Sequence, residues 1–133
     1  MKTNRLTLCD WVRGCVSGKA MRVTPELLRL LPDNGSFDGY EPIAIDSDFL
    51  LLNGWRAVTH DQYVIDFRTP DGGKLRFGWF LSSGRLVVGY TDVPRPVRDI
   101  DELQRVIRSF GYEGYANSLK LPQHMKTLSN DAR

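Results

Sequence analysis

Three segments in the middle of the chain alternate apolar and polar side chains at every second position. They span residues 62–68, 74–80 and 85–90, and the turn sequences Pro70-Asp71-Gly72-Gly73 and Ser82-Ser83-Gly84 separate them. Strict alternation bounded by turn residues is typical of strands with one buried face. The pattern predicts a three-stranded antiparallel meander. Its apolar face would carry Tyr63, Ile65, Phe67, Leu75, Phe77, Trp79, Leu86, Val88 and Tyr90.

A helical pattern follows the meander, from about Asp99 to Phe110. Its apolar residues recur at spacings of three and four, which places them on one face of a helix. They are Ile100, Leu103, Val106, Ile107 and Phe110. Acidic residues crowd the first turn, and Gly111 stands where a helix commonly ends. We expect this helix to cover the apolar face of the meander.

Residues 38–55 predict a strand followed by a short helix. The strand would run from Tyr40 to Ile45, and Asp46 would then cap the helix with its side chain. Asn53-Gly54 would end the helix, because glycine accepts the left-handed backbone of a C-terminal cap. Trp55 should pack back on Leu50, as the residue after such a glycine usually contacts the last helical turn.

The N-terminal region predicts a β-hairpin, with strands over 10–16 and 20–23 around Ser17-Gly18-Lys19. Thr24-Pro25-Glu26 predicts the start of a short helix that would contain Leu27 to Leu31. The expected fold class is therefore α+β: an N-terminal β-hairpin and short helix, a strand–helix unit, and the meander covered by the late helix. We expect a single domain over residues 1–116. Residues 117–133 are mostly polar and predict a loosely held C-terminal tail.

Composition narrows the function classes. The 133 residues are 41% hydrophobic and 26% charged, which is ordinary for a soluble protein. The net charge of +2, from 18 basic and 16 acidic residues, is too even to argue for a nucleic-acid or membrane partner by itself. The N-terminus lacks the apolar stretch of a signal peptide, so we expect a cytoplasmic protein.

Soft metal ligands are few: Cys9, Cys15, His60 and His124. Neither histidine pairs with the cysteines at a known metal-site spacing. Alternation would place the two cysteines on one face of a strand, where a free thiol packs as a small apolar group. We expect two reduced thiols, no metal site and no cofactor.

Catalytic constellations are also weak. His60-Asp61 resembles the beginning of a general base, but a nucleophile is missing beside it. Ser82-Ser83 is expected at the opposite end of the hairpin pair, with no nucleophile-elbow sequence around it. The sequence therefore predicts a protein that is not an enzyme.

Two groups of residues are candidates for binding. The polar face of the meander would carry Arg68, Lys74, Arg76 and Arg85 against Asp66 alone, a pattern that suits a nucleic-acid strand. The alternative is a solvated sheet face or an edge protected by charge. Trp11 and Tyr40 would line a groove for a partner near the N-terminal hairpin. Alternatively, Trp11 fills its own small β-unit.

Several short segments follow one another along the chain in an order that resembles the motif order of a known group of proteins. The segments are Asp10-Trp11-Val12, Gly18-Lys19, Met21-Arg22-Val23-Thr24, Glu41-Pro42-Ile43 through Leu50 to Asn53-Gly54-Trp55, and Asp101-Glu102-Leu103-Gln104. They resemble the GDWV opening, the EPIPLTxExLxxxGF segment and the late HELQN helix of small uncharacterised proteins. That group is common in Bacteroides-type gut bacteria and their phages and mobile elements. In this chain Cys9 replaces the opening glycine, Ala44 the second proline and Asp46 the capping threonine, and Ile100-Asp101 stands for the frequent Val-His.

The resemblance covers about residues 6 to 111 and implies a cytosolic accessory protein of bacterial or phage origin, with no activity to carry over. We therefore expect a non-enzymatic binding or accessory protein with a protein partner and no membrane partner. The alternative is a nucleic-acid-associated protein that uses the basic face of the meander.

Overall fold

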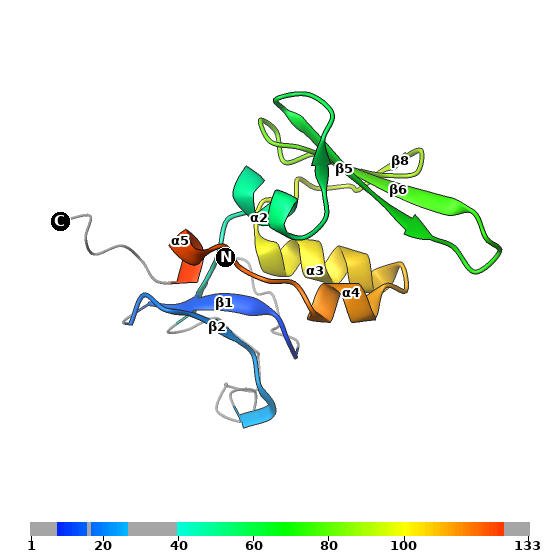
Figure 1. The fold of residues 1–133 in the computed structure, drawn as a ribbon. Helices are drawn as coiled ribbons and strands as arrows, with labels where there is room; N and C mark the ends of the chain where they lie inside the picture. The colour runs from blue at the N-terminus through cyan, green and yellow to red at the C-terminus, as the bar shows by residue number, and fades with distance from the viewer. Residues whose placement is uncertain (1–7, 16, 27–39, 127–133) are drawn as a thin grey trace. The chain divides into compact units, whose positions relative to one another are not determined.

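Two antiparallel sheets and several short helices build the protein, whose computed structural model describes residues 8–15, 17–26 and 40–126 (Figure 1). The α+β class expected from the sequence is confirmed. The chain divides into two compact units, where the sequence analysis expected one domain. One unit joins the chain ends, residues 1–44 and 99–133, and is called the terminal unit. The other, residues 45–98, is continuous and is called the middle unit.

The terminal unit contains a three-stranded sheet in the order β2-β1-β3. Its strands are β1 (Trp11–Gly14), β2 (Ala20–Arg22) and β3 (Tyr40–Pro42). The expected N-terminal hairpin is confirmed, because β1 pairs antiparallel with β2 and Gly18 adopts a φ of 70° in the turn. The expected helix over Leu27 to Leu31 lies outside the described residues.

Helix α3 (Ile100–Ser109) is the main helix of the terminal unit and begins as its sequence indicates. Asp99 and Glu102 form a capping box, in which each side chain accepts the other residue's backbone N–H. Gly111, with φ 96°, ends the helix, and the N–H of Tyr112 donates to Ile107 O. Helix α3 contacts β1 and helix α4 (Glu113–Asn117) in this unit. Its expected packing on the meander stays a prediction.

The C-terminal segment needs a correction, because the loosely held tail does not begin at residue 117. Leu119, Leu121 and Met125 are buried, and helix α5 spans Gln123–Lys126. Two arginines of the N-terminal hairpin bind backbone carbonyls of this segment: Arg22 those of Asn117 and Leu119, and Arg13 that of Met125. Four separated apolar residues, Leu119, Leu121, Met125 and Leu128, looked too few for a core in the sequence. Guanidinium hydrogen bonds to the backbone nonetheless hold residues 117–125 in place.

The middle unit opens with helix α2 (Ser47–Leu52), and its predicted ends are confirmed. Asp46 accepts a hydrogen bond from Phe49 N, and Gly54 has a φ of 92°. The N–H groups of Gly54 and Trp55 donate to Leu51 O and Leu50 O, which is the Schellman pattern. Trp55 and Leu50 are both buried.

A five-stranded antiparallel sheet completes the middle unit, in the order β4-β5-β6-β7-β8. The strands are β4 (Arg56–Ala57), β5 (Gln62–Arg68), β6 (Lys74–Phe80), β7 (Leu86–Val88) and β8 (Thr91–Asp92). The predicted meander is β5-β6-β7, and the β5–β6 hairpin is its longest part (Figure 1). The sequence pattern missed both edge strands, because two residues are too short to show an alternation.

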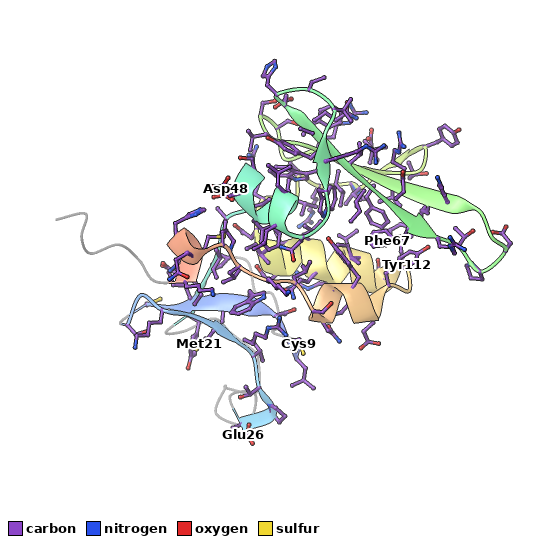
Figure 2. All side chains as sticks on the ribbon, viewed as in Figure 1. Cys9, Met21, Glu26, Asp48, Phe67 and Tyr112 are labelled. Carbon is purple, nitrogen blue, oxygen red and sulfur yellow. The ribbon has the colours of Figure 1, made fainter. Side chains whose placement is uncertain are left out.

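The inner face of this sheet forms much of the unit's core. Its buried side chains are Tyr63, Ile65, Phe77, Trp79, Leu86 and Val88. Phe67, labelled on the long hairpin in Figure 2, meets Phe77 edge to face with ring centroids 5.2 Å apart. Tyr90 was expected on this face, but it is fully exposed. The reason is local: Gly89, with φ 64°, starts the two-residue turn between β7 and β8, so the alternation ends at Val88.

Candidate binding face of the five-stranded sheet

The side of the five-stranded sheet opposite its apolar core is called the outer face. Alternation along the strands and their register assign its residues. They are Arg56, Gln62, Val64, Asp66, Arg68, Lys74, Arg76, Gly78, Phe80, Arg85, Val87 and Asp92. The four basic residues singled out in the sequence all belong to this face, and β4 adds a fifth, Arg56.

Three of these arginines form ion pairs on the outer face. Arg76 binds Asp66 through two hydrogen bonds of 2.7 and 3.0 Å, and Arg56 approaches the same carboxylate at 3.7 Å. Arg85 binds Asp92 through bonds of 2.9 and 3.3 Å. The hydrogen bond from Arg76 is the main cause that lowers the pKa of Asp66. The sequence analysis counted Asp66 as the only acid here, because Asp92 comes to this face through the unpredicted strand β8.

A hollow of about 200 Å³ lies at the centre of the outer face and is called the Gly78 slot. Its lining residues are Gln62, Val64, Arg76, Gly78, Phe80, Arg85, Val87 and Gly89. Gly78 pairs with Val64 on one side and with Val87 on the other. The missing side chain of Gly78 therefore leaves a gap between two valines, with an arginine on either side.

The fold does not require a glycine at position 78. A Cβ there would lie 3.5 Å from Gln62 Nε2 and 3.8 Å from Val64 Cγ1, both ordinary contact distances. The backbone of Gly78 also lacks the positive φ that favours glycine. Glycine inside a strand weakens it, and it often marks a place where a ligand approaches the backbone closely. Neither backbone conformation nor close packing therefore explains the glycine at position 78.

The apolar lining of the slot lies beside a charged group. The guanidinium carbon of Arg85 lies 5.4 Å from the centroid of the Phe80 ring, a cation–π distance. Val64 is only 1% exposed, although it belongs to the outer face. An apolar group in the slot would meet the half-buried Val87 and Phe80, with the buried Val64 and Gly78 forming the floor beneath it, and a carboxylate beside it would meet guanidinium groups.

Trp11 and Tyr40 do not line one groove. Trp11 is at the start of β1, and Tyr40 pairs with Gly14 at its end, about 10 Å away at the usual rise of a strand. Alternation also places the two side chains on opposite faces of the sheet. Trp11 Nε1 donates to Leu119 O at 2.9 Å, and Arg22 stacks on its ring. Trp11 thus packs within the terminal unit, which agrees with the alternative given in the sequence analysis.

The residues His60, Asp61 and Ser82 do not form a catalytic arrangement in the described structure. The sequence analysis placed Ser82 at the far end of the hairpin from His60, which is wrong. Antiparallel pairing of Gln62 with Phe80 brings the two loops together, and Asp61 accepts hydrogen bonds from Ser82 N and Oγ at 2.7 and 3.0 Å. Among the described residues, no hydrogen bond joins Ser82 to His60, which is exposed.

Both cysteines are free, as expected, but their predicted packing is wrong for Cys15, which is exposed. Strand β1 is shorter than predicted, so both thiols lie outside it. Cys9, labelled in Figure 2, precedes β1 and has a φ of 70°, the one positive φ of a non-glycine residue in the described ranges.

A buried polar network in the terminal unit was missed by the sequence analysis. Gln104 is fully buried, and its side chain donates to Cys9 O and Ala116 O and accepts from Trp11 N. Arg108 donates to the buried Asp10 at 2.6 Å. Gln104 and Arg108 occupy positions of α3 that the sequence pattern assigns to the solvent-facing side of the helix. Every bond joins distant parts of the chain, so no local pattern could reveal them.

Asp101, also in the terminal unit, is a buried carboxylate whose hydrogen bonding is incomplete. Its side chain is 1% exposed, and Arg105 binds Oδ2 at 3.2 Å. Within the described residues, Oδ1 has no hydrogen-bond partner. Burial raises the pKa of Asp101 to about 6, against the opposing effect of Arg105. The sequence analysis assigned this carboxylate to the helix dipole, which accounts for its place in the first turn but not for its burial.

The chain matches no family model, no curated protein and no solved structure. In the described part of the chain, no helix combines the length and apolar character needed to cross a membrane.

Proposed function

We propose that the protein is a non-enzymatic binding module that engages a protein partner through the outer face of its five-stranded sheet. The observation that carries this proposal is the Gly78 slot. Alanine suits a strand better than glycine does, and the surrounding side chains leave room for its Cβ at position 78. Ligand access is a physical reason for keeping this position empty.

The ion pairs of the outer face favour a protein partner over nucleic acid. Asp66 and Asp92 neutralise part of the charge of Arg76 and Arg85, and both carboxylates would repel phosphate groups. The overall charge of +2 provides little long-range attraction for a polyanion. Nucleic-acid binding by Arg68, Lys74, Arg76 and Arg85 is the alternative.

An origin in the Bacteroides and phage-associated group is part of this proposal. The group's opening glycine stands where this chain has Cys9, and the backbone there has the positive φ that glycine accepts most readily. The group's second glycine corresponds to Gly54, where φ is 92°. Both correspondences support the resemblance through backbone conformation.

A peptide-display selection tests the proposed function. Purified full-length protein would be exposed to yeast cells that display short random peptides. The affinity of the enriched peptides would then be measured for the parent protein and for variants of it. We expect Gly78→Leu to lower their affinity about tenfold or more, since the new side chain occupies the space of one buried apolar group.

Gly114→Leu is the matched control, because a Cβ at Gly114 meets no atom within 4 Å. It should leave the affinity unchanged, and circular dichroism of both variants should match the parent. Enrichment that Gly78→Leu does not affect would overturn the outer face as the binding surface. Tight, salt-sensitive retention of oligonucleotides would favour the nucleic-acid alternative instead.

A further inference from the structure

The charges around the Gly78 slot specify the chemistry of its ligand. The outer face carries five basic side chains, those of Arg56, Arg68, Lys74, Arg76 and Arg85, against the carboxylates of Asp66 and Asp92. This excess is concentrated on one face of a chain whose overall charge is nearly balanced. A partner that meets this face gains from negative charge.

The guanidinium groups beside the slot can exchange their present carboxylate partners for those of a ligand. Arg76 and Arg85 each have a side chain 55% exposed, and Asp92 is equally exposed. Exposed ion pairs contribute little to stability, so a carboxylate of a partner can replace one without a large penalty. At Asp66, moreover, Arg56 and Arg76 share a single carboxylate, which leaves positive charge for another.

The slot itself selects an apolar group. Its floor and walls are Gly78, Val64 and Val87, and the Phe80 ring lies at one end. A volume of about 200 Å³ accommodates one side chain and is too small for a folded element. One apolar side chain and flanking carboxylates form a pattern that a single peptide segment can present.

We infer that the Gly78 slot binds an acidic segment of a partner protein, with one aromatic or aliphatic side chain seated over Gly78 against Val87 and Phe80 and with carboxylates bound to Arg76 and Arg85. This inference rests on the proposed function and specifies its partner. It assigns Gly78 the role of admitting the apolar side chain, and the two arginines the role of selecting charge.

Fluorescence anisotropy with three labelled peptides tests the inference. The probes are a glutamate-rich peptide with a central phenylalanine, the same peptide with a central alanine, and a lysine-rich peptide with a central phenylalanine. The full chain should bind the first peptide. The second should bind about tenfold more weakly, the loss expected for one buried apolar side chain, and the third should not bind measurably.

Variants then assign the selectivity to named residues. Arg76→Gln with Arg85→Gln should lower the affinity for the acidic phenylalanine peptide about tenfold and flatten its salt dependence. Asp92→Asn should raise that affinity, because it removes the carboxylate that competes for Arg85. Lys126→Gln, on α5 in the terminal unit, is a charge control that should change nothing.

Equal binding of the glutamate-rich and lysine-rich peptides would overturn the inference. If display-selected peptides without acidic residues still lose affinity on Gly78→Leu, the proposed function stands and only the acidic partner fails. If no selected peptide responds to Gly78→Leu, the proposed function fails as well. A tighter complex with an oligonucleotide, abolished by Arg76→Gln with Arg85→Gln, would replace both with the nucleic-acid alternative.

Discussion

Single residues of the terminal unit carry strain that the rest of the fold tolerates. Cys9 adopts a φ of 70°, and its N–H donates to Val23 O while its carbonyl accepts from Gln104. A left-handed backbone is unfavourable for any residue with a Cβ. Hydrogen bonds on both sides of Cys9 hold it in this conformation nonetheless.

Replacing Cys9 with glycine should therefore stabilise the protein. We expect the free energy of unfolding to rise by about 1 kcal/mol, the scale of the left-handed penalty less the added freedom of the unfolded chain. Urea denaturation of Cys9→Gly and of the control Cys9→Ala checks this. A gain shared equally by both variants would trace the effect to the thiol and contradict the backbone explanation.

Asp101 gives the terminal unit a pH dependence with a definite sign. Burial raises its pKa from the ordinary value of 3.8 to about 6, so the folded chain holds the proton more tightly than the unfolded chain. Stability is then lost as the pH rises from about 4 to about 6, because the unfolded chain releases its proton first.

The variant Asp101→Asn removes this loss. At pH 8 it should raise the free energy of unfolding by about 1–3 kcal/mol, on the scale of 1.36 kcal/mol for each pKa unit. Near pH 4 the gain should vanish. Urea denaturation at both pH values checks this, with the exposed Glu113→Gln as control. A variant less stable than the parent at pH 8 would show that ionised Asp101 is stabilising.

At the scale of elements, two glycines of the middle unit should respond in opposite ways to the same substitution. Gly54 ends α2 with a φ of 92°, which alanine accepts poorly. Gly78 lies inside β6 with no positive φ and with room for a Cβ. The first glycine serves the backbone, whereas the second leaves a space on the surface.

We expect Gly54→Ala to lower the free energy of unfolding by about 1 kcal/mol and Gly78→Ala to raise it by about 0.5–1 kcal/mol. Thermal or urea denaturation of the two variants measures the sign of each change in the free energy of unfolding. A destabilising Gly78→Ala would mean that the strand needs its glycine, and the argument for a ligand would lose its basis.

Elements with local signals could be predicted from the sequence, and those without could not. The ends of α2 and α3 follow from Asp46, Gly54, Asp99 and Gly111, whose side chains or backbone act within one helical turn. The pairing of β5, β6 and β7 follows from alternation and turn residues. Strand β8 is too short to show an alternation, although its partner β7 is only a two-residue turn away. The partly buried segment 117–126 depends on Arg13 and Arg22, which are distant in the chain, so its sequence carried no local signal.

The candidate site likewise contains features that could be predicted from the sequence and features that could not. Alternation placed Arg68, Lys74, Arg76 and Arg85 on one face. The strand register agrees for the first three, and Arg85 lines the same slot as Arg76. The slot was missed, because a glycine inside a strand becomes informative only when its cross-strand neighbours are known. Asp92 was missed with β8, so the face looked more basic in the sequence than it is.

At the scale of the whole molecule, the chain combines a nearly neutral overall charge with one face on which basic residues outnumber acidic ones. This distribution suits a short-range contact with an acidic protein segment better than long-range attraction of a polyanion. The middle unit, residues 45–98, carries the entire candidate surface. The account therefore assigns recognition to a continuous stretch of the sequence.

Chemical-shift mapping by NMR would locate the peptide-binding surface residue by residue. ¹⁵N-labelled protein would be titrated with the glutamate-rich peptide that carries a central phenylalanine, and the backbone amide shifts would be followed residue by residue. The account predicts that the largest changes occur at Val64, Gly78 and Val87, and that Gly78→Leu abolishes them. Changes confined to residues outside the outer face, or unaffected by Gly78→Leu, would contradict the assignment of the slot as the binding site.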